Sequence, residues 1–590
     1  MQARARHEDG SDAAAGAAAR ESRGWLALPA LAALVYLALA LHAARVETPT
    51  VDEFAHVPAG VASWRQGRTD LYRSNPPLTK LLLAAPLAVD PSVHDPPVRE
   101  TPLLWGPWEY GHRFLNANRE DYLALMFRAR CVAVALGLLA GVVVFRWARD
   151  AFGLRAAAAV ASLFLLCPNV LAHGHLATID LAALCTVLLA LFALRWAYGS
   201  SSAARLTLAG AALGLALATK FSAVLLLPVV AVLAVTERWR LEEGPPARRL
   251  LHAARDFAWM LVAALVVVNA SVGFEGAFEP LGNLPLRSQF ATGLQAVLPG
   301  GLPVPLPREY VLGFDGAKEI LEHGEFGSYL LGRWSAQGWW YYNLVAWSVK
   351  LPLAVLLLLT AAVPLWWRRL RSRPGGWRGP GGPDRRELLF LLLPLVTLMG
   401  VFSMSSNLNI GIRHLLPALP FVFLLLGPNF TPKATRVGER LCRGAMGLAL
   451  GASVVNAATL HPDYLTFFNA LAGGPARGGE WLIDSNLDWG QDLYRVPAAV
   501  AAIAKDEIPY LLYFGHVDPA LYGLRYRLLP PTPVEGIVAV SENFFRGAAY
   551  LSVSPDGAMI GVAGDTAAWL QAYEPVARVG SIRLYDTRRK

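Results

Sequence analysis

The feature that most constrains this chain is a series of long apolar blocks joined by shorter polar connections. A membrane-spanning helix needs about 20 apolar residues, and charged residues make up only 16% of the chain. We therefore expect a polytopic α-helical membrane protein with about eleven transmembrane helices. The blocks lie at 25–43, 128–147, 156–172, 176–195, 206–219, 221–236, 256–272, 341–365, 388–404, 414–427 and 442–460.

Arginine residues gather in alternate connections between these blocks. Basic loops of membrane proteins stay on the cytoplasmic side, so the pattern predicts a cytoplasmic N-terminus in a cell inner (plasma) membrane. Residues 1–24 then form a disordered cytoplasmic tail, and 25–460 form the transmembrane domain with outer loops 44–127 and 273–340. The basic connections are 146–155, 195–205, 238–249, 366–387 and 432–443.

The last part of the chain has a different pattern. In 461–590, β-like runs at 510–515 and 536–541 alternate with a helical pattern at 489–504. This alternation predicts a small extracytoplasmic α/β domain. In the first outer loop, 76–89 is too short to span and is predicted to lie as a helix in the membrane interface.

Ionisable side chains collect on the predicted outer face of the membrane. Asp52 and Glu53 follow the first block directly, while Asp180, Lys220 and Arg413 lie where other blocks begin. Because an ionisable group at the membrane is costly, such residues mark a functional site by default. Further candidates on the same face are His56, Asn75, Lys80, Trp339, Trp340, Tyr341, His414, Asn486, Asp488, Trp489 and Gln491.

Most of these residues are also compatible with a structural role. Asp180 could cap the helix that follows it, and the Lys220 side chain could extend to the interface. Arg413 and His414 could contact lipid head groups, and the aromatic residues at 339–342 could form an interfacial belt.

Taken together, the set suits a substrate with an anionic head and an apolar tail. Cations would hold a phosphate, and a carboxylate would act on a hydroxyl. The four cysteines show no zinc-binding spacing, and no metal is indicated. A transporter or flippase of lipid-linked sugars is the alternative; it predicts internal repeats and polar residues near the middle of the membrane, and neither is visible in the sequence.

Several ordered motifs resemble a known family. The Asp52–Glu53 pair is followed by "NPPLTKLLLAAP", "ATIDLAALCTVLLALFALRW" and "GLALATKFSAVLLLP". This order resembles family 39 membrane glycosyltransferases, which include protein O-mannosyltransferases and lipid A aminoarabinose transferases and share the GT-C fold. The later motifs "GWWYYNLVAWSVKLPL", "NIGIRHLLPALPF", "HPDYLTFFNALAGGP" and "DSNLDWGQDL" resemble an uncharacterised bacterial branch of that family.

The resemblance implies a reaction and roles for individual residues. A sugar would pass from a polyprenyl phosphate to an acceptor hydroxyl on a lipid, glycan or protein, with inversion and without a cofactor. Asp52 would be the general base, and Glu53 would orient the acceptor or the loop. Lys220, Arg413 and His414 would bind the donor phosphate. The implied partners are the membrane and the two substrates, and nucleic acid is not among them.

The motif "DSNLDWGQDL" at 484–493 allows two interpretations. Asp488 with Gln491 three residues later resembles a capping box at the start of the helix predicted to follow. The motif also follows a β-like run at 480–484, and a strand-to-helix turn is a common place for a ligand. A sugar or acceptor contact is therefore a second hypothesis, with the C-terminal domain as the acceptor-side module.

Overall fold

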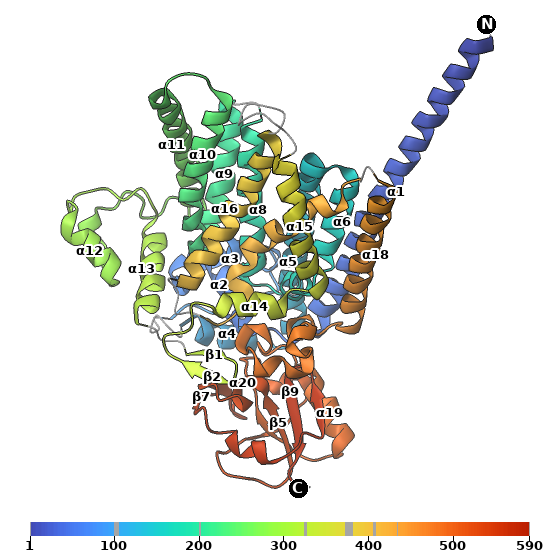
Figure 1. The fold of residues 1–590 in the computed structure, drawn as a ribbon. Coiled ribbons are helices and arrows are strands. Elements are labelled where there is room, and N and C mark those ends of the chain that lie inside the picture. The colour runs from blue at the N-terminus through green and yellow to red at the C-terminus, as the bar shows by residue number, and fades with distance from the viewer. Residues whose placement is uncertain are drawn as a thin grey trace.

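The structure is a computed structural model, which describes residues 2–99, 106–199, 202–323, 327–371, 382–404, 409–432 and 435–588. The side chains of residues 2–23, 382 and 383 lie outside this described part. Figure 1 shows a bundle of long helices with a smaller C-terminal domain at one end of it.

Long apolar helices form the bundle. Within the described residues, nine helices are long and apolar enough to cross a membrane. The first includes the residues predicted as a disordered tail, for which that prediction remains open. The nine are α1 (Gln2–Val46, apolar over Gly24–Val46), α5 (Tyr122–Phe152), α8 (Ile179–Ala197), η2 (Phe221–Leu225) with α10 (Leu226–Leu241), α11 (Pro246–Ala270), α15 (Leu353–Arg371), α16 (Gly382–Met404), Ile412–Phe430 with α17 (Leu419–Leu425), and α18 (Arg436–Thr459).

Two further apolar segments lie in the bundle. α6 (Leu154–Leu165) and α7 (Pro168–Gly174) are bent by 58° at a short break, which coincides with Pro168, a residue that cannot donate a helical hydrogen bond. α9 (Ala203–Thr219) has 17 residues. Each predicted apolar block overlaps one of these segments, so the prediction of a polytopic helical membrane protein is confirmed.

The block predicted as one span at 341–365 is divided in the structure. α14 (Tyr342–Lys350) ends two residues before Pro352, and α15 begins after it. A residue that precedes proline is disfavoured in a helix, and the buried Lys350 ammonium donates to the carbonyl of Asn486 (2.6 Å). Figure 1 shows α14 lying across the end of the bundle, next to the C-terminal domain.

Both outer loops contain helices. A Cβ at Gly60 would lie 2.2 Å from the carbonyl oxygen of Lys80. The missing side chain therefore allows the helix that contains Gly60 and the helix that contains Lys80 to pack closely. The helix predicted at 76–89 is present and packs on its neighbour. The elements are α2 (Val51–Gln66), η1 (Thr69–Tyr72), α3 (Leu78–Ala88) and α4 (Gly106–Ala117), then α12 (Gln289–Val297), α13 (Arg308–His323), β1 (Ser328–Leu330) and β2 (Arg333–Ser335).

The C-terminal domain is built on a five-stranded sheet of order β4-β3-β5-β9-β8, with a separate β6-β7 hairpin. β3 is parallel to β4 and β5, whereas β9 is antiparallel to β5 and β8. The predicted α/β region is therefore confirmed. Its elements are α19 (Val496–Ile503), β3 (Tyr510–Leu512), β4 (Arg527–Leu528), β5 (Ile537–Ser541), α20 (Glu542–Phe545), β6 (Tyr550–Val553), β7 (Met559–Val562), β8 (Ala577–Val579) and β9 (Ile582–Asp586).

Two local predictions in this domain were wrong. The β-like run at 480–484 forms turns and not a strand, because Asp484 takes a left-handed backbone (φ 59°). The helix predicted at 489–504 begins only at Val496, since Gly490 also has a positive φ of 89° and interrupts the helix. Asp488 and Gln491 therefore do not form a capping box for that helix.

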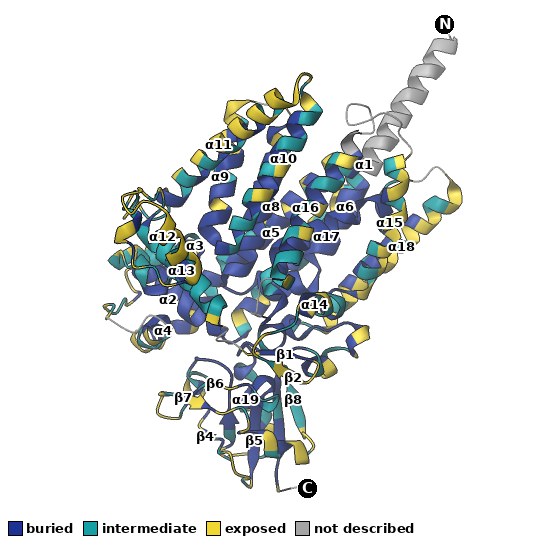
Figure 2. Cartoon of the chain, turned by 60° about the vertical axis from the view of Figure 1, so that its left-hand side comes forward, coloured by how far each residue is buried: buried dark blue, intermediate teal, exposed yellow. Residues whose placement is uncertain are grey.

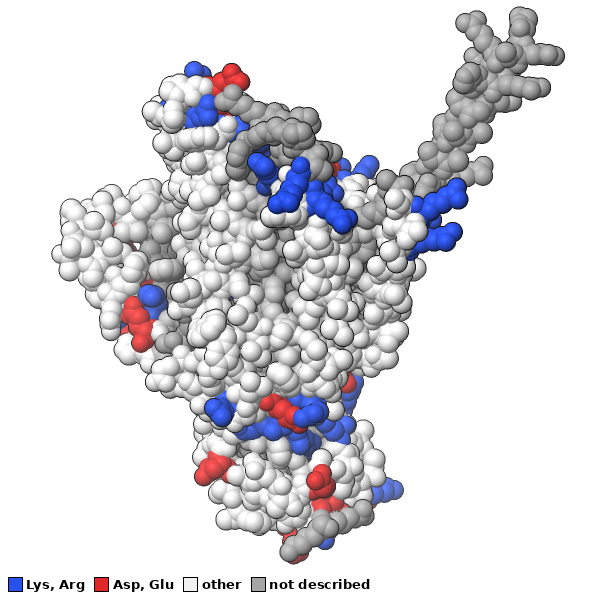
Figure 3. Space-filling view, in the orientation of Figure 1, with Lys and Arg blue, Asp and Glu red and all other residues white. Residues whose placement is uncertain are grey.

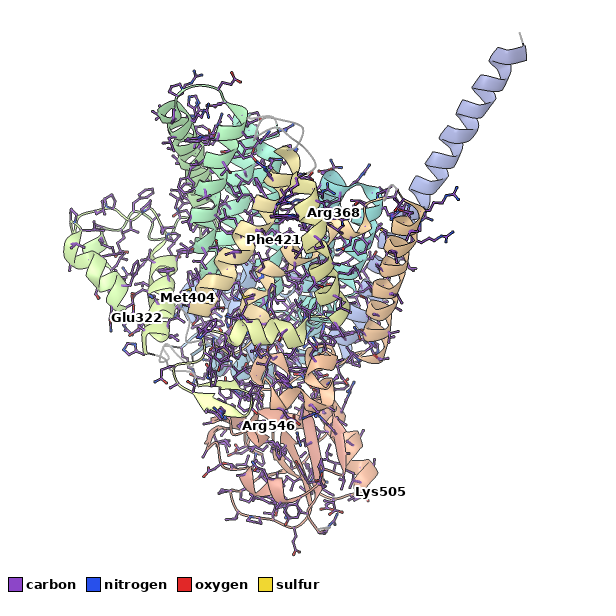
Figure 4. All side chains as sticks on the ribbon, viewed as in Figure 1. Glu322, Arg368, Met404, Phe421, Lys505 and Arg546 are labelled. Atoms are coloured by element: carbon purple, nitrogen blue, oxygen red, sulfur yellow. The ribbon has the colours of Figure 1, made fainter. Side chains whose placement is uncertain are left out.

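Charge and burial divide the bundle into zones. In Figure 3, Lys and Arg gather at the end of the bundle away from the C-terminal domain and again next to that domain, with an uncharged belt between. Arg368 of a predicted cytoplasmic connection lies at the first of these ends (Figure 4). Figure 2 shows the buried residues concentrated in the centre of the bundle and at its junction with the C-terminal domain.

Candidate active site

The Asp52–Glu53 pair lies in the first turn of α2. The Glu53 carboxylate accepts hydrogen bonds from the amide (2.8 Å) and hydroxyl (3.0 Å) of Thr50, which fixes the start of the helix. Adjacent residues on a helix point about 100° apart, so the two acids face different surroundings.

Glu53 has a structural role. Its two carboxylate oxygens bind the Arg130 guanidinium at 2.7 Å each, and one of them also accepts the amide of Ala177 (2.7 Å). Burial alone would raise the pKa of Glu53, but the Arg130 charge and these hydrogen bonds lower it below its usual value. Of the two roles predicted for Glu53, this geometry fits orientation of the loop, because both oxygens are occupied.

Asp52 instead begins a chain of alternating charges. Its Oδ2 binds Nη1 of Arg413 at 2.5 Å, and the same nitrogen lies 3.9 Å from Asp180. Asp180 in turn binds the Lys220 ammonium at 2.7 Å. The chain joins α2, the Ile412–Phe430 segment, α8 and the turn after α9. The structure thus brings together four residues that are far apart in sequence.

The chain of charges leaves several atoms open for a ligand. The Asp52 side chain is 17% exposed, and among the described residues its Oδ1 has no hydrogen-bond partner. Within the same part of the chain, the buried Nε of Arg413 and Oδ2 of Asp180 also lack a hydrogen-bond partner. A phosphate could therefore bind Arg413 while a hydroxyl approaches Asp52.

The motif at 484–493 contacts the chain of charges at Arg413. The Arg413 guanidinium stacks on the Trp489 ring at 4.5 Å, and the Trp489 carbonyl accepts the amide of Val51 (3.1 Å). The Gln491 carbonyl accepts the amide of Thr48 (3.0 Å), and its side chain accepts the amide of Trp489 (2.8 Å). The motif therefore holds both the Arg413 guanidinium and the segment 48–51 that precedes Asp52.

Two predicted residues of the same motif lie outside the charge chain. Asn486 accepts the amide of Ile412 (3.0 Å) and donates to the Tyr342 hydroxyl (3.0 Å). Asp488 is buried and accepts the Ser581 hydroxyl (3.1 Å) inside the C-terminal domain. Burial raises its pKa to about 7. Both side chains connect parts of the protein, and their role as substrate contacts stays a prediction.

His56 lies one turn beyond Asp52, with its Nε2 4.0 Å from the Asp52 carboxylate. Burial lowers the pKa of His56 to about 4, against the opposing effect of Asp52, so the ring is neutral at pH 7. It stacks on Tyr72 at 4.8 Å. Lys80 lies 4.9 Å from the same Tyr72 ring and donates to the carbonyls of Tyr72 and Asn75. Lys80 and Asn75 thus fix Tyr72 and, through it, His56.

The remaining predicted site residues lie in different surroundings. His414 is half-buried next to Arg413, and its buried Nε2 has no hydrogen-bond partner in the described part of the chain. Trp339 donates its amide to the Asn409 side chain (2.7 Å). Trp340 and Tyr341 are exposed, as in an interfacial belt, and their role as sugar contacts stays a prediction.

The sequence argument missed three side chains around the charge chain. Burial raises the pKa of Tyr550 in β6, and the charges of Asp52 and Asp484 raise it further. Burial and the Asp52 charge likewise raise the pKa of Tyr72. Asp484 lies in the quoted motif and could have been singled out, whereas no sequence pattern marks either tyrosine.

Asp52 lines neither of two cavities in the structure. One, of about 300 Å³, is lined by residues that include Arg45, Glu47, Arg130 and Tyr522. The other, of about 30 Å³, is lined by Asp484 among others. No group of three or more His, Cys, Asp or Glu side chains that could hold a metal occurs among the described residues.

Comparison with known families gives one sequence match. Residues 124–269 match the family described as dolichyl-phosphate-mannose-protein mannosyltransferase. This stretch extends from α5 to α11 and contains Asp180 and Lys220. The match confirms the resemblance to membrane glycosyltransferases and the prediction of a glycosyltransferase enzyme. No curated protein matches the chain.

Three solved structures are similar in overall arrangement. ArnT from Cupriavidus metallidurans bound to undecaprenyl phosphate is 15% identical, covering 95% of this chain and 98% of that chain, with a TM-score of 0.44. The S. cerevisiae protein O-mannosyltransferase Pmt1-Pmt2 complex bound to the sugar donor is 12% identical (74% and 90% covered, TM-score 0.46). The apo oligosaccharyltransferase of Archaeoglobus fulgidus is 12% identical (91% and 74% covered, TM-score 0.43).

The Glu53–Arg130 pair gives a prediction about stability. Glu53→Gln leaves the buried Arg130 charge without its carboxylate, so we expect a loss of about 3–5 kcal/mol and a lower midpoint of thermal unfolding for the purified protein. Glu507→Gln, at a more exposed acid, is the matched control and should keep the wild-type midpoint. An unchanged midpoint in Glu53→Gln would show that the pair does not hold the fold.

Proposed function

We propose that this membrane glycosyltransferase moves a sugar from a polyprenyl-phosphate donor to an acceptor hydroxyl, with Asp52 as the general base. The acceptor class, whether lipid, glycan or protein, stays open. The observation that carries the proposal is the chain Asp52–Arg413–Asp180–Lys220, in which each charged group lies within 3.9 Å of the next. The family match over 124–269 supports the same reaction class.

The reaction is a single displacement that inverts the anomeric carbon. The acceptor oxygen attacks that carbon as the bond to the phosphate oxygen breaks, and the lipid phosphate leaves with the electron pair. The hydroxyl becomes acidic only as the new bond forms, so its proton passes to Oδ1 of Asp52 late in the step. Such proton transfer contributes about 10²–10⁴-fold.

Arg413 and Lys220 would stabilise the departing phosphate. Negative charge grows on the phosphate as the bond breaks, and preorganised cations in a site that excludes water stabilise it strongly. Arg413 is held by Trp489 and Asp52, and Lys220 by Asp180. Because carboxylates and an aromatic ring fix both cations before the donor arrives, little reorganisation is needed during the reaction.

Donor binding would also change the partner of Asp52. A phosphate near the open Nε of Arg413 competes with Asp52 for the guanidinium. Neutral His56 lies 4.0 Å away, and both of its ring nitrogens lack a hydrogen-bond partner within the described residues. A buried donor without a partner costs about 1–3 kcal/mol, so His56 gains a hydrogen bond when it turns to Oδ2 of Asp52. His56 is thus a positioning residue.

The side of the membrane follows from charge. The basic connections lie at the end of the bundle opposite the C-terminal domain (Figure 3), and basic loops are retained in the cytoplasm. We therefore place the site and the C-terminal domain on the outer face of the inner membrane, with the N-terminus in the cytoplasm. Tyr550 and Trp489 come from the C-terminal region, which supports an acceptor-side role for it.

The central prediction concerns Asp52. Asp52→Asn removes the base but keeps the shape of the side chain, so we expect transfer from a polyprenyl-phosphate sugar to fall at least about 10²-fold. Asp150→Asn, at the far end of α5, should retain wild-type turnover. Turnover by Asp52→Asn at the wild-type rate, in protein that elutes as the folded species, would remove Asp52 from this role.

The donor-binding role of Lys220 predicts a change in KM. Lys220→Ala should raise the donor KM about 10-fold or more, because a charge-assisted hydrogen bond contributes about 1.5–3 kcal/mol. Lys505→Ala, on the C-terminal domain away from the bundle (Figure 4), serves as the control. If Lys220→Ala keeps the wild-type donor KM, its ammonium serves only Asp180.

The positioning role of His56 predicts a different kinetic signature. His56→Phe keeps the stacking on Tyr72 but removes the donor, so kcat should fall about 10-fold or more with an unchanged donor KM. His56→Gln should recover part of kcat. Equal kcat in the Phe variant and the wild type would contradict the proposed change of partner.

A further inference from the structure

The second outer loop contains an apolar hairpin that the proposed reaction does not use. It runs from the end of α11 through α12 to α13, and only Arg287 is charged between Pro280 and Pro307. α12 has no buried residue. Large apolar side chains are exposed along the hairpin, namely Phe278, Phe290, Leu294, Val297, Leu298 and Leu302. A monomer in water rarely exposes a contiguous apolar surface of this kind.

Several polar side chains of this hairpin are satisfied internally. The Gln295 amide donates to the carbonyls of Leu281 (2.7 Å) and Leu284 (2.9 Å), and the Thr292 hydroxyl donates to the carbonyl of Ser288 (2.8 Å). The outward surface is mainly apolar, although the Asn283, Arg287 and Gln289 side chains are also exposed. Internal satisfaction of polar groups is what hydrocarbon requires of any segment within it.

The backbone of the two extended arms is paired as well. Phe278 donates to Val304 (2.8 Å), Leu281 to Leu302 (2.9 Å) and Gly282 to the carbonyl of Gly300 (2.8 Å). The return arm contains four prolines, at 299, 303, 305 and 307, which have no amide hydrogen to satisfy. Few free donors therefore remain in these arms.

The hairpin lies at the level of the membrane bundle. Figure 1 shows α12 beside the helices and not beside the C-terminal domain, and most of the surface there is uncharged in Figure 3, with charged atoms toward its lower end. It continues a lipid-facing surface of α11, on which Trp259, Val262 and Val266 are exposed at helical spacing. This continuity favours lipid over water or a soluble protein as the covering phase.

Charge marks which end of the hairpin faces water. α12 begins beside α13, where Glu322 accepts the amides of Gln289 (2.7 Å) and Phe290 (3.2 Å) and Asp315 accepts that of Ser288 (3.0 Å). Glu322 lies at the end of α13 nearest the C-terminal domain (Figure 4). The opposite end of α12, at Val297, is 77% exposed and entirely apolar.

We propose that α12 and its flanking arms form a hairpin inserted into the outer leaflet, with the Val297 end in the lipid tails and the Glu322 end at the head groups. The loop predicted to lie wholly outside the membrane thus returns to it. α13 connects the hairpin to the reaction site, because the Tyr310 ring packs edge-to-face against the Phe221 ring (centroids 5.2 Å apart), next to Lys220.

Spin-label depth measurements test this proposal without any assay of activity. Single nitroxides would be attached at Val297→Cys and Leu294→Cys in a Cys131→Ala background, since the other native cysteines are buried. The protein would be reconstituted into phosphatidylethanolamine–phosphatidylglycerol vesicles. Val262→Cys on α11 is the lipid-facing control, and Ile508→Cys in the C-terminal domain is the aqueous control.

We expect the label at 297 to collide more often with oxygen than with a water-soluble nickel chelate, as at 262, and the label at 508 to show the reverse. The label at 294 should lie at the same depth or nearer the head groups. A label at 297 with the accessibility found at 508 would overturn the proposal. Low accessibility to both reagents at 297 would also overturn it, because protein, such as a second copy, would then cover the surface.

Discussion

The rest of the site depends on the contacts that the Arg413 guanidinium makes. It binds Asp52, lies 3.9 Å from Asp180 and stacks on Trp489. A buried cation is stable only when charges and hydrogen bonds compensate for its desolvation. This requirement draws α2, α8, the Ile412–Phe430 segment and the C-terminal motif to one point, so the geometry of the site and the docking of the C-terminal domain have the same origin.

The neighbouring acids Asp52 and Glu53 differ in burial, and this difference gives one a structural role and leaves the other available to a substrate. Glu53 is enclosed, and Arg130 and the amide of Ala177 occupy its oxygens. Asp52 keeps one oxygen open and retains some exposure. The buried pair fixes the start of α2, and the second acid can therefore be presented to a substrate at a defined position. The roles of Asp52 and Glu53 are not interchangeable, because each role depends on the surroundings of the side chain.

The sequence predicted the membrane fold well because lipid requires long apolar helices, and hydropathy records them directly. It also predicted Asp52, Asp180, Lys220 and Arg413, since charges at the ends of apolar blocks are unusual. It could not assign Arg130 to Glu53, because that pairing is between distant parts of the chain. The split at Pro352, the left-handed Asp484 and the contribution of Tyr550 depend on tertiary packing, which no local pattern reports.

We propose above all that Arg413 and Lys220 together bind a lipid phosphate beside Asp52. A structure of the protein with bound polyprenyl phosphate tests this most directly. We expect the phosphate within about 3 Å of both cations, with Asp52 turned toward His56. Phosphate density in the 300 Å³ cavity near Arg45, with Arg413 still bound to Asp52, would contradict the account.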